Sequence, residues 1–159
     1  MIMSDMLVKL YDVKLDLELE ESLRREGITI KRALGLDKTP ILQFVQDHFS
    51  KQWADECEMG LIHEGCYIAV YKQEVVGFAC FDATMKDYFG PTGVRKDMRG
   101  KGIGRALLIR CLHSMYERGY NYAIIGWAGP TAFYEKACGA ISIPDSTPRS
   151  YGRMISVDV

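Results

Sequence analysis

The stretch Val94-Arg-Lys-Asp-Met-Arg-Gly-Lys-Gly-Ile-Gly-Arg-Ala-Leu-Leu108 decides the fold of this chain. A predicted strand ends here, three glycines alternate with Lys101 and Ile103, and an amphipathic helix begins. Glycine lets the backbone turn tightly and lets a ligand approach its N–H groups without a Cβ in the way. The first N–H groups of a helix lack partners within the helix and carry the positive end of its dipole. The stretch therefore predicts an anion site, most naturally for phosphate or pyrophosphate.

Two common phosphate-binding patterns do not fit this turn. The dinucleotide pattern G-x-G-x-x-G fails because Arg105 stands where its third glycine would be. The P-loop pattern G-x-x-x-x-G-K-[ST] fails because Gly102 and Gly104 are followed by isoleucine and arginine rather than by lysine. Arg99, Lys101 and Arg105 add positive charge around the turn. The alternative is a glycine-rich helix start that binds nothing.

The surrounding elements can be predicted from hydrophobic periodicity and from turn residues. Strands are expected at 6–11, 28–34, 66–70, 75–81, 88–94, 122–127, 140–143 and 153–157. Helices are expected at 16–26, from Thr39-Pro40 to about Cys57, from Gly102 to Gly119, and at 130–137. This order predicts a mixed α/β layer built on one main sheet.

Composition limits the class of protein. The 159 residues suit a single domain, 1–159, and 20 Lys and Arg against 21 Asp and Glu give no field for nucleic acid or an anionic membrane. No apolar run reaches the roughly 18 residues of a membrane span, and the N-terminus has no signal-peptide pattern. Five cysteines without a C-x-x-C indicate reduced thiols in a cytoplasmic protein.

A metal site is not expected. The spacing His63-x-x-Cys66, with Cys57 nearby, is the nearest approach to a ligand pattern, but no second close pair accompanies it. We therefore predict no metal.

Two motifs together give a family resemblance. Arg99-Gly-Lys-Gly-Ile-Gly104 satisfies [QR]-x-x-G-x-[GA], and Phe133-Tyr-Glu-Lys136 follows on a short predicted helix after a strand. In this order they resemble the GNAT superfamily of acyl-CoA-dependent N-acyltransferases, over roughly residues 28 to 143. Residues 1–27 would be an N-terminal extension, and Trp127 stands where many relatives have asparagine.

The resemblance implies a fold and a coenzyme. The fold would be a central mixed, mostly antiparallel sheet, splayed between its fourth and fifth strands and flanked by helices on both faces. Acetyl-CoA would be the cosubstrate, with its pantetheine arm in the opening and its pyrophosphate on the glycine-rich turn. The residues expected to hold it are Thr92, Val94, Arg99, Gly100, Lys101, Gly102, Ile103, Gly104 and Arg105.

The expected reaction is acetyl transfer to a primary amine of a small molecule or peptide, by direct attack in a ternary complex. Tyr134 matches the family tyrosine that protonates the leaving thiolate, and the Val94 N–H would support the oxyanion. Asp82, after a buried-looking strand, is our first choice of general base. The other candidates for this base are Glu56, Asp87 and Tyr88. Trp53 and Trp127 either line an acceptor pocket or pack in the core.

Two alternatives stay open. The chain could be a non-catalytic acyl-CoA-binding module or sensor, or an acyltransferase that uses another acyl group or an oxygen acceptor. The resemblance also leaves a homodimer open.

Overall fold

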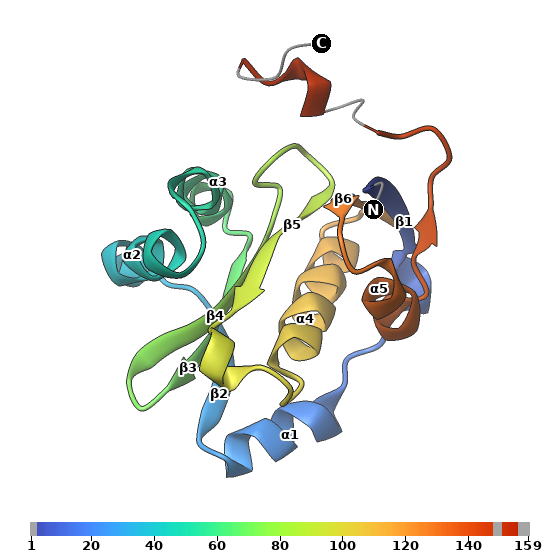
Figure 1. The fold of residues 1–159 in the computed structure, drawn as a ribbon. Helices are drawn as coiled ribbons and strands as arrows, with labels where there is room; N and C mark the ends of the chain where they lie inside the picture. Colours follow the sequence, from blue (N-terminus) through green and yellow to red (C-terminus); the bar gives the residue numbers. More distant parts are fainter. Residues whose placement is uncertain (1–2, 148–150, 156–159) are drawn as a thin grey trace.

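The structure, a computed structural model, describes residues 3–147 and 151–155 and is built on one seven-stranded sheet (Figure 1). The strand order is β2-β3-β4-β5-β6-β1-β7, and every pair is antiparallel except β5 with β6, which is parallel. This confirms the mixed, mostly antiparallel sheet. The strands are β1 (Ser4–Lys9), β2 (Ile28–Arg32), β3 (Cys66–Tyr71), β4 (Glu74–Phe81), β5 (Tyr88–Val94), β6 (Tyr122–Ala128) and β7 (Ile141–Ser142).

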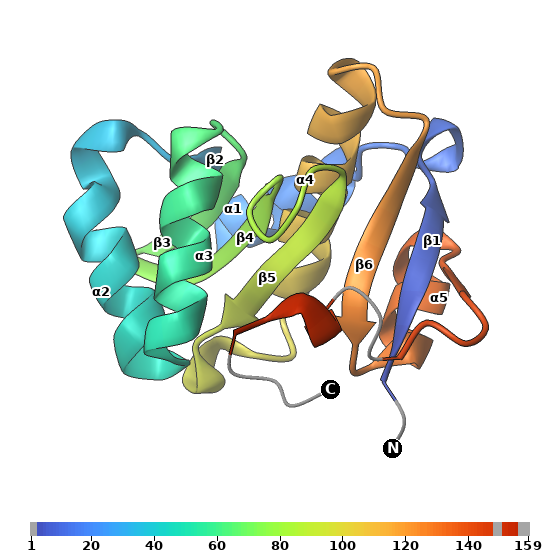
Figure 2. The ribbon, with the colours of Figure 1, turned by 90° about the horizontal axis from the view of Figure 1, so that it is seen from above.

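Helices cover both faces of the sheet (Figures 1 and 2). The helices α1 (Leu17–Arg25), α4 (Ile103–Glu117) and α5 (Thr131–Cys138) share one apolar core, and α2 (Lys38–His48) and α3 (Lys51–Ile62) share another across the sheet. The apolar stripe predicted for the long helix is buried along α4, because Leu107, Leu112 and Met115 have no exposed surface. No helix within the described residues is both long and apolar enough to cross a membrane.

The single helix predicted from Thr39-Pro40 to about Cys57 is wrong, because the chain breaks it into α2 and α3. Phe49 leaves helical geometry, with φ −133° and ψ −88°, and the Ser50 side chain caps α3 by accepting from Trp53 N at 3.0 Å. The break lays Phe49 across β5, where a Cβ at Gly93 would lie 2.3 Å from the Phe49 ring. The apparent strand breaker Gly93 is therefore a point of close packing.

The sheet opens between β5 and β6. These strands pair only at Tyr88 with Ile124 and at Phe89 with Ile125. The β4–β5 register slips by one residue between Phe89 and Thr92, and Pro91 in this bulge has no N–H to donate. Beyond it β5 pairs with β4 alone. This is the splay that the resemblance implied between the fourth and fifth strands of the sheet. It lies between β5 and β6 here because β1 adds one strand at the start of the chain.

The described residues of the segment predicted as an extension, 3–27, enter the fold through β1 and α1. The strand β1 lies between β6 and β7, and Met6, Val8 and Leu10 are fully buried. Arg110 of α4 holds Glu20 of α1 through two hydrogen bonds of 2.7 and 2.8 Å.

A closing strand at 153–157 is wrong for residues 153–155, which continue from a 3-10 turn at Tyr151–Arg153. Residues 156 and 157 lie outside the described part. The strand that pairs with β6 on the side away from β5 is β1, from the start of the chain.

Candidate active site

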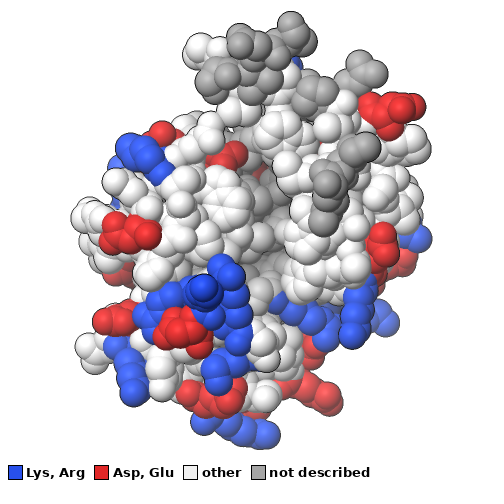
Figure 3. Space-filling model, viewed as in Figure 1, with Lys and Arg blue, Asp and Glu red and all other residues white. Residues whose placement is uncertain are grey.

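The opening between β5 and β6 holds a cavity of about 840 Å³. Figure 3 shows a hollow in this face of the molecule, with Lys and Arg side chains gathered around its lower end. Of the residues predicted to hold the coenzyme, Lys101 alone does not line the cavity. Those that line it are Thr92, Val94, Arg99, Gly100, Gly102, Ile103, Gly104 and Arg105.

The first turn of α4 presents free N–H groups to this cavity. Gly102 caps the helix with φ 92°, a left-handed conformation that glycine adopts without strain, and no side chain caps the helix. Among the described residues, no hydrogen bond uses the N–H of Ile103, Gly104 or Arg105. With the helix dipole behind them, these amides form the geometry that an anion needs.

The cations beside the turn have only weak partners. Arg105 lies 3.4 Å from Asp16, and Lys101 lies 3.8 Å from Glu26. Exposed pairs of this kind contribute about 0–1 kcal/mol, so a diphosphate can compete with the carboxylates. The Arg99 Nε donates to Val94 O at 3.0 Å, which fixes the turn to the end of β5.

Backbone amides of β5 face the same opening. The Arg95 N–H donates to Val76 O of β4 at 2.8 Å. Because successive residues of a strand point their N–H groups to opposite edges, those of Val94 and Thr92 point away from β4. The strand β6 does not pair with this part of β5, so these amides are free for an extended ligand.

Tyr134 reaches the cavity from α5. Its side chain is 7% exposed and makes edge contacts with the rings of Phe89 and Phe133. Burial raises the pKa of Tyr134 to about 12, so its hydroxyl keeps its proton at neutral pH. No hydrogen bond among the described residues uses this hydroxyl, which leaves it free to donate to a ligand.

Asp82 is not brought to the cavity. Its carboxylate accepts from the Asp87 N–H at 2.7 Å and from the Tyr120 hydroxyl at 3.0 Å, and it holds the turn between β4 and β5. Asp87 lies in the same turn and likewise does not line this cavity. Sequence position alone suggested Asp82 as the base, and the structure shows its carboxylate engaged in these hydrogen bonds.

A second cavity of about 560 Å³ adjoins the first, since Trp53 and Trp127 line both. Glu56 of α3 lines it and accepts from the Thr84 hydroxyl at 2.6 Å. Burial raises the pKa of Glu56, although the Thr84 hydrogen bond opposes the shift. Of the four candidate bases, Glu56 is the one that lines either of these two cavities.

Two residues that position Trp127, Asp5 and Tyr151, could not be found from the sequence. Trp127 has φ 46°, and its backbone N–H donates to the Asp5 carboxylate of β1 at 3.0 Å. Tyr151 stacks on the Trp127 ring, with centroids 4.4 Å apart and planes at 13°. Asp5 and Tyr151 lie far from the motifs in the chain, so only the fold reveals their place.

Comparison with known proteins agrees with this geometry. The model of the acetyltransferase (GNAT) family matches residues 35–140, about two thirds of the chain, and the chain belongs to that family. Among curated proteins none matches significantly.

Solved structures show the same fold at low identity. A GCN5-related glucosamine N-acetyltransferase region of a fungal multi-domain β-N-acetylglucosaminidase gives a TM-score of 0.73 at 15% identity, covering 90% of this chain and 20% of that one. A GCN5-related N-acetyltransferase from Sphaerobacter thermophilus gives 0.63 at 22%, covering 90% and 50%. One from Kribbella flavida gives 0.59 at 15%, covering 89% and 55%. The chain thus spans about half or less of these proteins.

Proposed function

We propose that this chain transfers an acetyl group from acetyl-CoA to a primary amine, by direct attack in a ternary complex. The observation that carries the proposal is one cavity with free amides of α4 at one end, free amides of β5 along its wall and the Tyr134 hydroxyl on α5. A diphosphate, an extended amide chain and a thioester match these three features in turn.

In this proposal the coenzyme lies along the opening. Its pyrophosphate accepts from the N–H groups of Ile103, Gly104 and Arg105, and Arg99 and Arg105 add charge. The pantetheine arm lies along the free edge of β5 between Thr92 and Val94, as a further strand would. The thioester then lies toward the end of the cavity lined by Tyr134, Trp53 and Trp127.

The chemistry needs three groups around the thioester. The Val94 N–H stabilises the oxyanion formed when the amine attacks the carbonyl carbon. The C–N bond forms, the C–S bond breaks, and the Tyr134 hydroxyl gives its proton to the leaving sulfur. Glu56, as a carboxylate, takes the proton that the amine nitrogen loses, directly or through water. That proton returns to the phenolate and restores the enzyme.

The acceptor pocket favours an amine with an apolar body. Its wall combines the aromatic rings of Trp53, Trp127 and Tyr151 with one partly buried carboxylate, that of Glu56. An ammonium group is attracted by both aromatic faces and a carboxylate. We therefore rank arylalkyl primary amines first, ahead of a sugar amine such as the glucosamine named for one structural neighbour. The five free cysteines suit the reducing cytoplasm.

The test is release of free CoA thiol from acetyl-CoA in the presence of single amines, with product masses read in parallel. We expect thiol release that depends on an arylalkyl amine and a product heavier by one acetyl group. Coenzyme binding without release on a broad amine panel would make the chain a binding module instead. Transfer only from a longer acyl-CoA, or to a hydroxyl, would overturn the acetyl or the amine assignment, respectively.

A further inference from the structure

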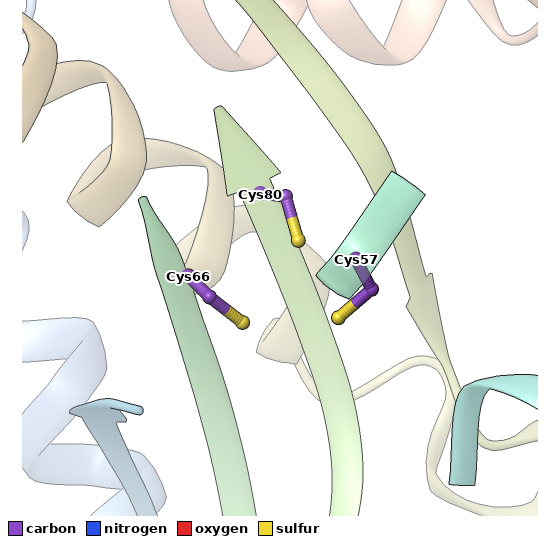
Figure 4. A group of neighbouring side chains, drawn as sticks. All are labelled: Cys57, Cys66 and Cys80. Carbon is purple, nitrogen blue, oxygen red and sulfur yellow. The ribbon is translucent and has the colours of Figure 1, made fainter. Parts of the chain in front are cut away.

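Three cysteine thiols meet in the core between α3 and the sheet. Cys57 of α3, Cys66 of β3 and Cys80 of β4 have Sγ atoms that all lie within 4.8 Å of one another. Figure 4 shows the three side chains pointing toward a common centre from these three elements. Their exposures are 0%, 2% and 0%, so the cluster is closed to solvent. His63, the other ligand type in this part of the sequence, is not a member of the group.

The fold fixes this convergence. Cys66 and Cys80 are direct partners in the β3–β4 register, so their side chains leave the same face of the sheet. Gly60, one turn after Cys57, lets α3 approach that face, since a Cβ there would lie 3.0 Å from Cys80 Cβ.

The geometry suits three bonds to one soft centre. Around a centre with metal–sulfur bonds of about 2.3 Å, three sulfurs lie about 4 Å apart or less, and the three Sγ atoms here lie within 4.8 Å of one another. Zinc prefers four ligands, and the described residues supply only these three. A disulfide between Cys66 and Cys80 would use two sulfurs and leave the third without a role.

Burial narrows the class of occupant. The three cysteines belong to a buried apolar group that includes Ile41, Val45 and Phe78. The buried charged residues of the described part are Asp5 of β1 and Glu20 of α1, which lie on other elements. Three thiolates around a monovalent ion leave two negative charges there, and around a divalent ion they leave one. A trivalent centre leaves none, and an uncompensated charge in an apolar core costs several kcal/mol.

We propose that Cys57, Cys66 and Cys80 form a three-sulfur binding site for a trivalent thiophilic centre, of which arsenite is the simplest. Binding of arsenous acid breaks three S–H and three As–O bonds, forms three As–S bonds and releases three water molecules. No electron is transferred, and the buried site stays uncharged. Entry requires α3 to move from the sheet, and the bound centre then fixes α3 to β3 and β4.

The site adjoins the acceptor pocket, since Cys57 follows Glu56 on α3. Occupancy therefore also restrains the helix that carries the proposed base. The test nevertheless needs no activity and is independent of the acetyl-transfer proposal.

The experiment is X-ray absorption at the arsenic edge on the reduced wild-type chain with one equivalent of arsenite. We expect three sulfur neighbours, and at a hundredfold excess over Kd an unfolding temperature raised by about 5–10 °C. Cys57→Ala, Cys66→Ala and Cys80→Ala should each lose the third sulfur neighbour and most of the thermal shift. Cys111→Ala, which removes a fully buried thiol of α4 outside the group, is the matched control and should keep both.

Two or fewer sulfur neighbours in the wild-type chain would overturn the proposal, and this result does not depend on any variant folding. Stoichiometric binding of Cu(I) or Zn²⁺ with three sulfur neighbours, without binding of arsenite, would overturn the charge argument. Equal loss in Cys111→Ala would place the site elsewhere.

Discussion

Two neighbouring glycines of the α4 turn predict opposite effects of the same substitution. Gly102 has φ 92°, and a Cβ there would lie 2.8 Å from Leu19 Cδ1 of α1. Gly104 has no positive φ, and a Cβ there would meet Val94 Cγ2 at an ordinary 3.7 Å. Alanine at 104 therefore fits the folded protein, whereas alanine at 102 does not.

The magnitudes follow from these positions. Gly102→Ala should lose about 1–2 kcal/mol of stability from the left-handed backbone alone. Gly104→Ala should be as stable as wild type or up to about 1 kcal/mol more stable, because alanine favours the helix. Its methyl group, however, stands where the diphosphate must approach the helix amides. Loss of one charge-assisted hydrogen bond, about 1.5–3 kcal/mol, weakens CoA binding about 10- to 150-fold.

Urea unfolding and calorimetric titration with CoA measure the two quantities separately. The account requires Gly104→Ala to gain or keep stability while it loses affinity. A folded Gly104→Ala protein that binds CoA within about threefold of wild type would refute the placement of the diphosphate on α4.

Three further predictions concern single side chains. Tyr134→Phe should lower kcat by about 10²–10⁴ with the KM for acetyl-CoA and the unfolding temperature nearly unchanged, since its hydroxyl has no partner among the described residues; a kcat equal to wild type in steady-state assays would exclude it as the acid. Glu56→Gln should remove the acid limb of the rate profile, which in wild type rises with pH through a carboxyl pKa that burial raises; a limb retained in the variant would assign the base elsewhere. Burial, and secondly the negative charge of Asp82, raise the pKa of Asp87 from 3.8 to about 6. The folded state therefore binds a proton more tightly than the unfolded state, and the free energy of unfolding falls as pH rises between these two values. Asp87→Asn should therefore stabilise the chain at pH 7 by about 1 kcal/mol after allowance for solvent screening, and by nothing at pH 3.5; urea unfolding showing the same difference at both pH values would contradict this.

The sequence predicted best where local chemistry is strongest. The turn at 99–104 and the apolar stripe of α4 determine their own structure, because glycine conformation and helical periodicity are local properties. The hairpin of β3 and β4 is likewise confirmed, with Lys72 and Gln73 at φ 49° and 65° in its turn.

The sequence predicted least well where contacts between segments far apart in the chain determine the structure. Continuous periodicity through Phe49 hid the break between α2 and α3, which a cap at Ser50 and packing on Gly93 create. The position of β1 between β6 and β7 depends on pairing across more than a hundred residues, which no local pattern records. The surroundings of Asp82 and Glu56 are likewise set by distant segments, because Tyr120 and Thr84 supply their hydrogen bonds from other elements.

The convergence of three cysteines is also a tertiary fact. Cys57, Cys66 and Cys80 have no metal-ligand spacing in the sequence. They come together only through the register of β3 with β4 and the packing of α3 against the sheet.

The most direct test of the central claim is an NMR titration of the ¹⁵N-labelled chain with CoA, followed at the backbone amides. We predict saturable downfield shifts of the Ile103, Gly104 and Arg105 protons, as expected of N–H groups that donate to a diphosphate. Bound CoA that leaves these three amides unmoved, or no binding to the folded chain, would contradict the account.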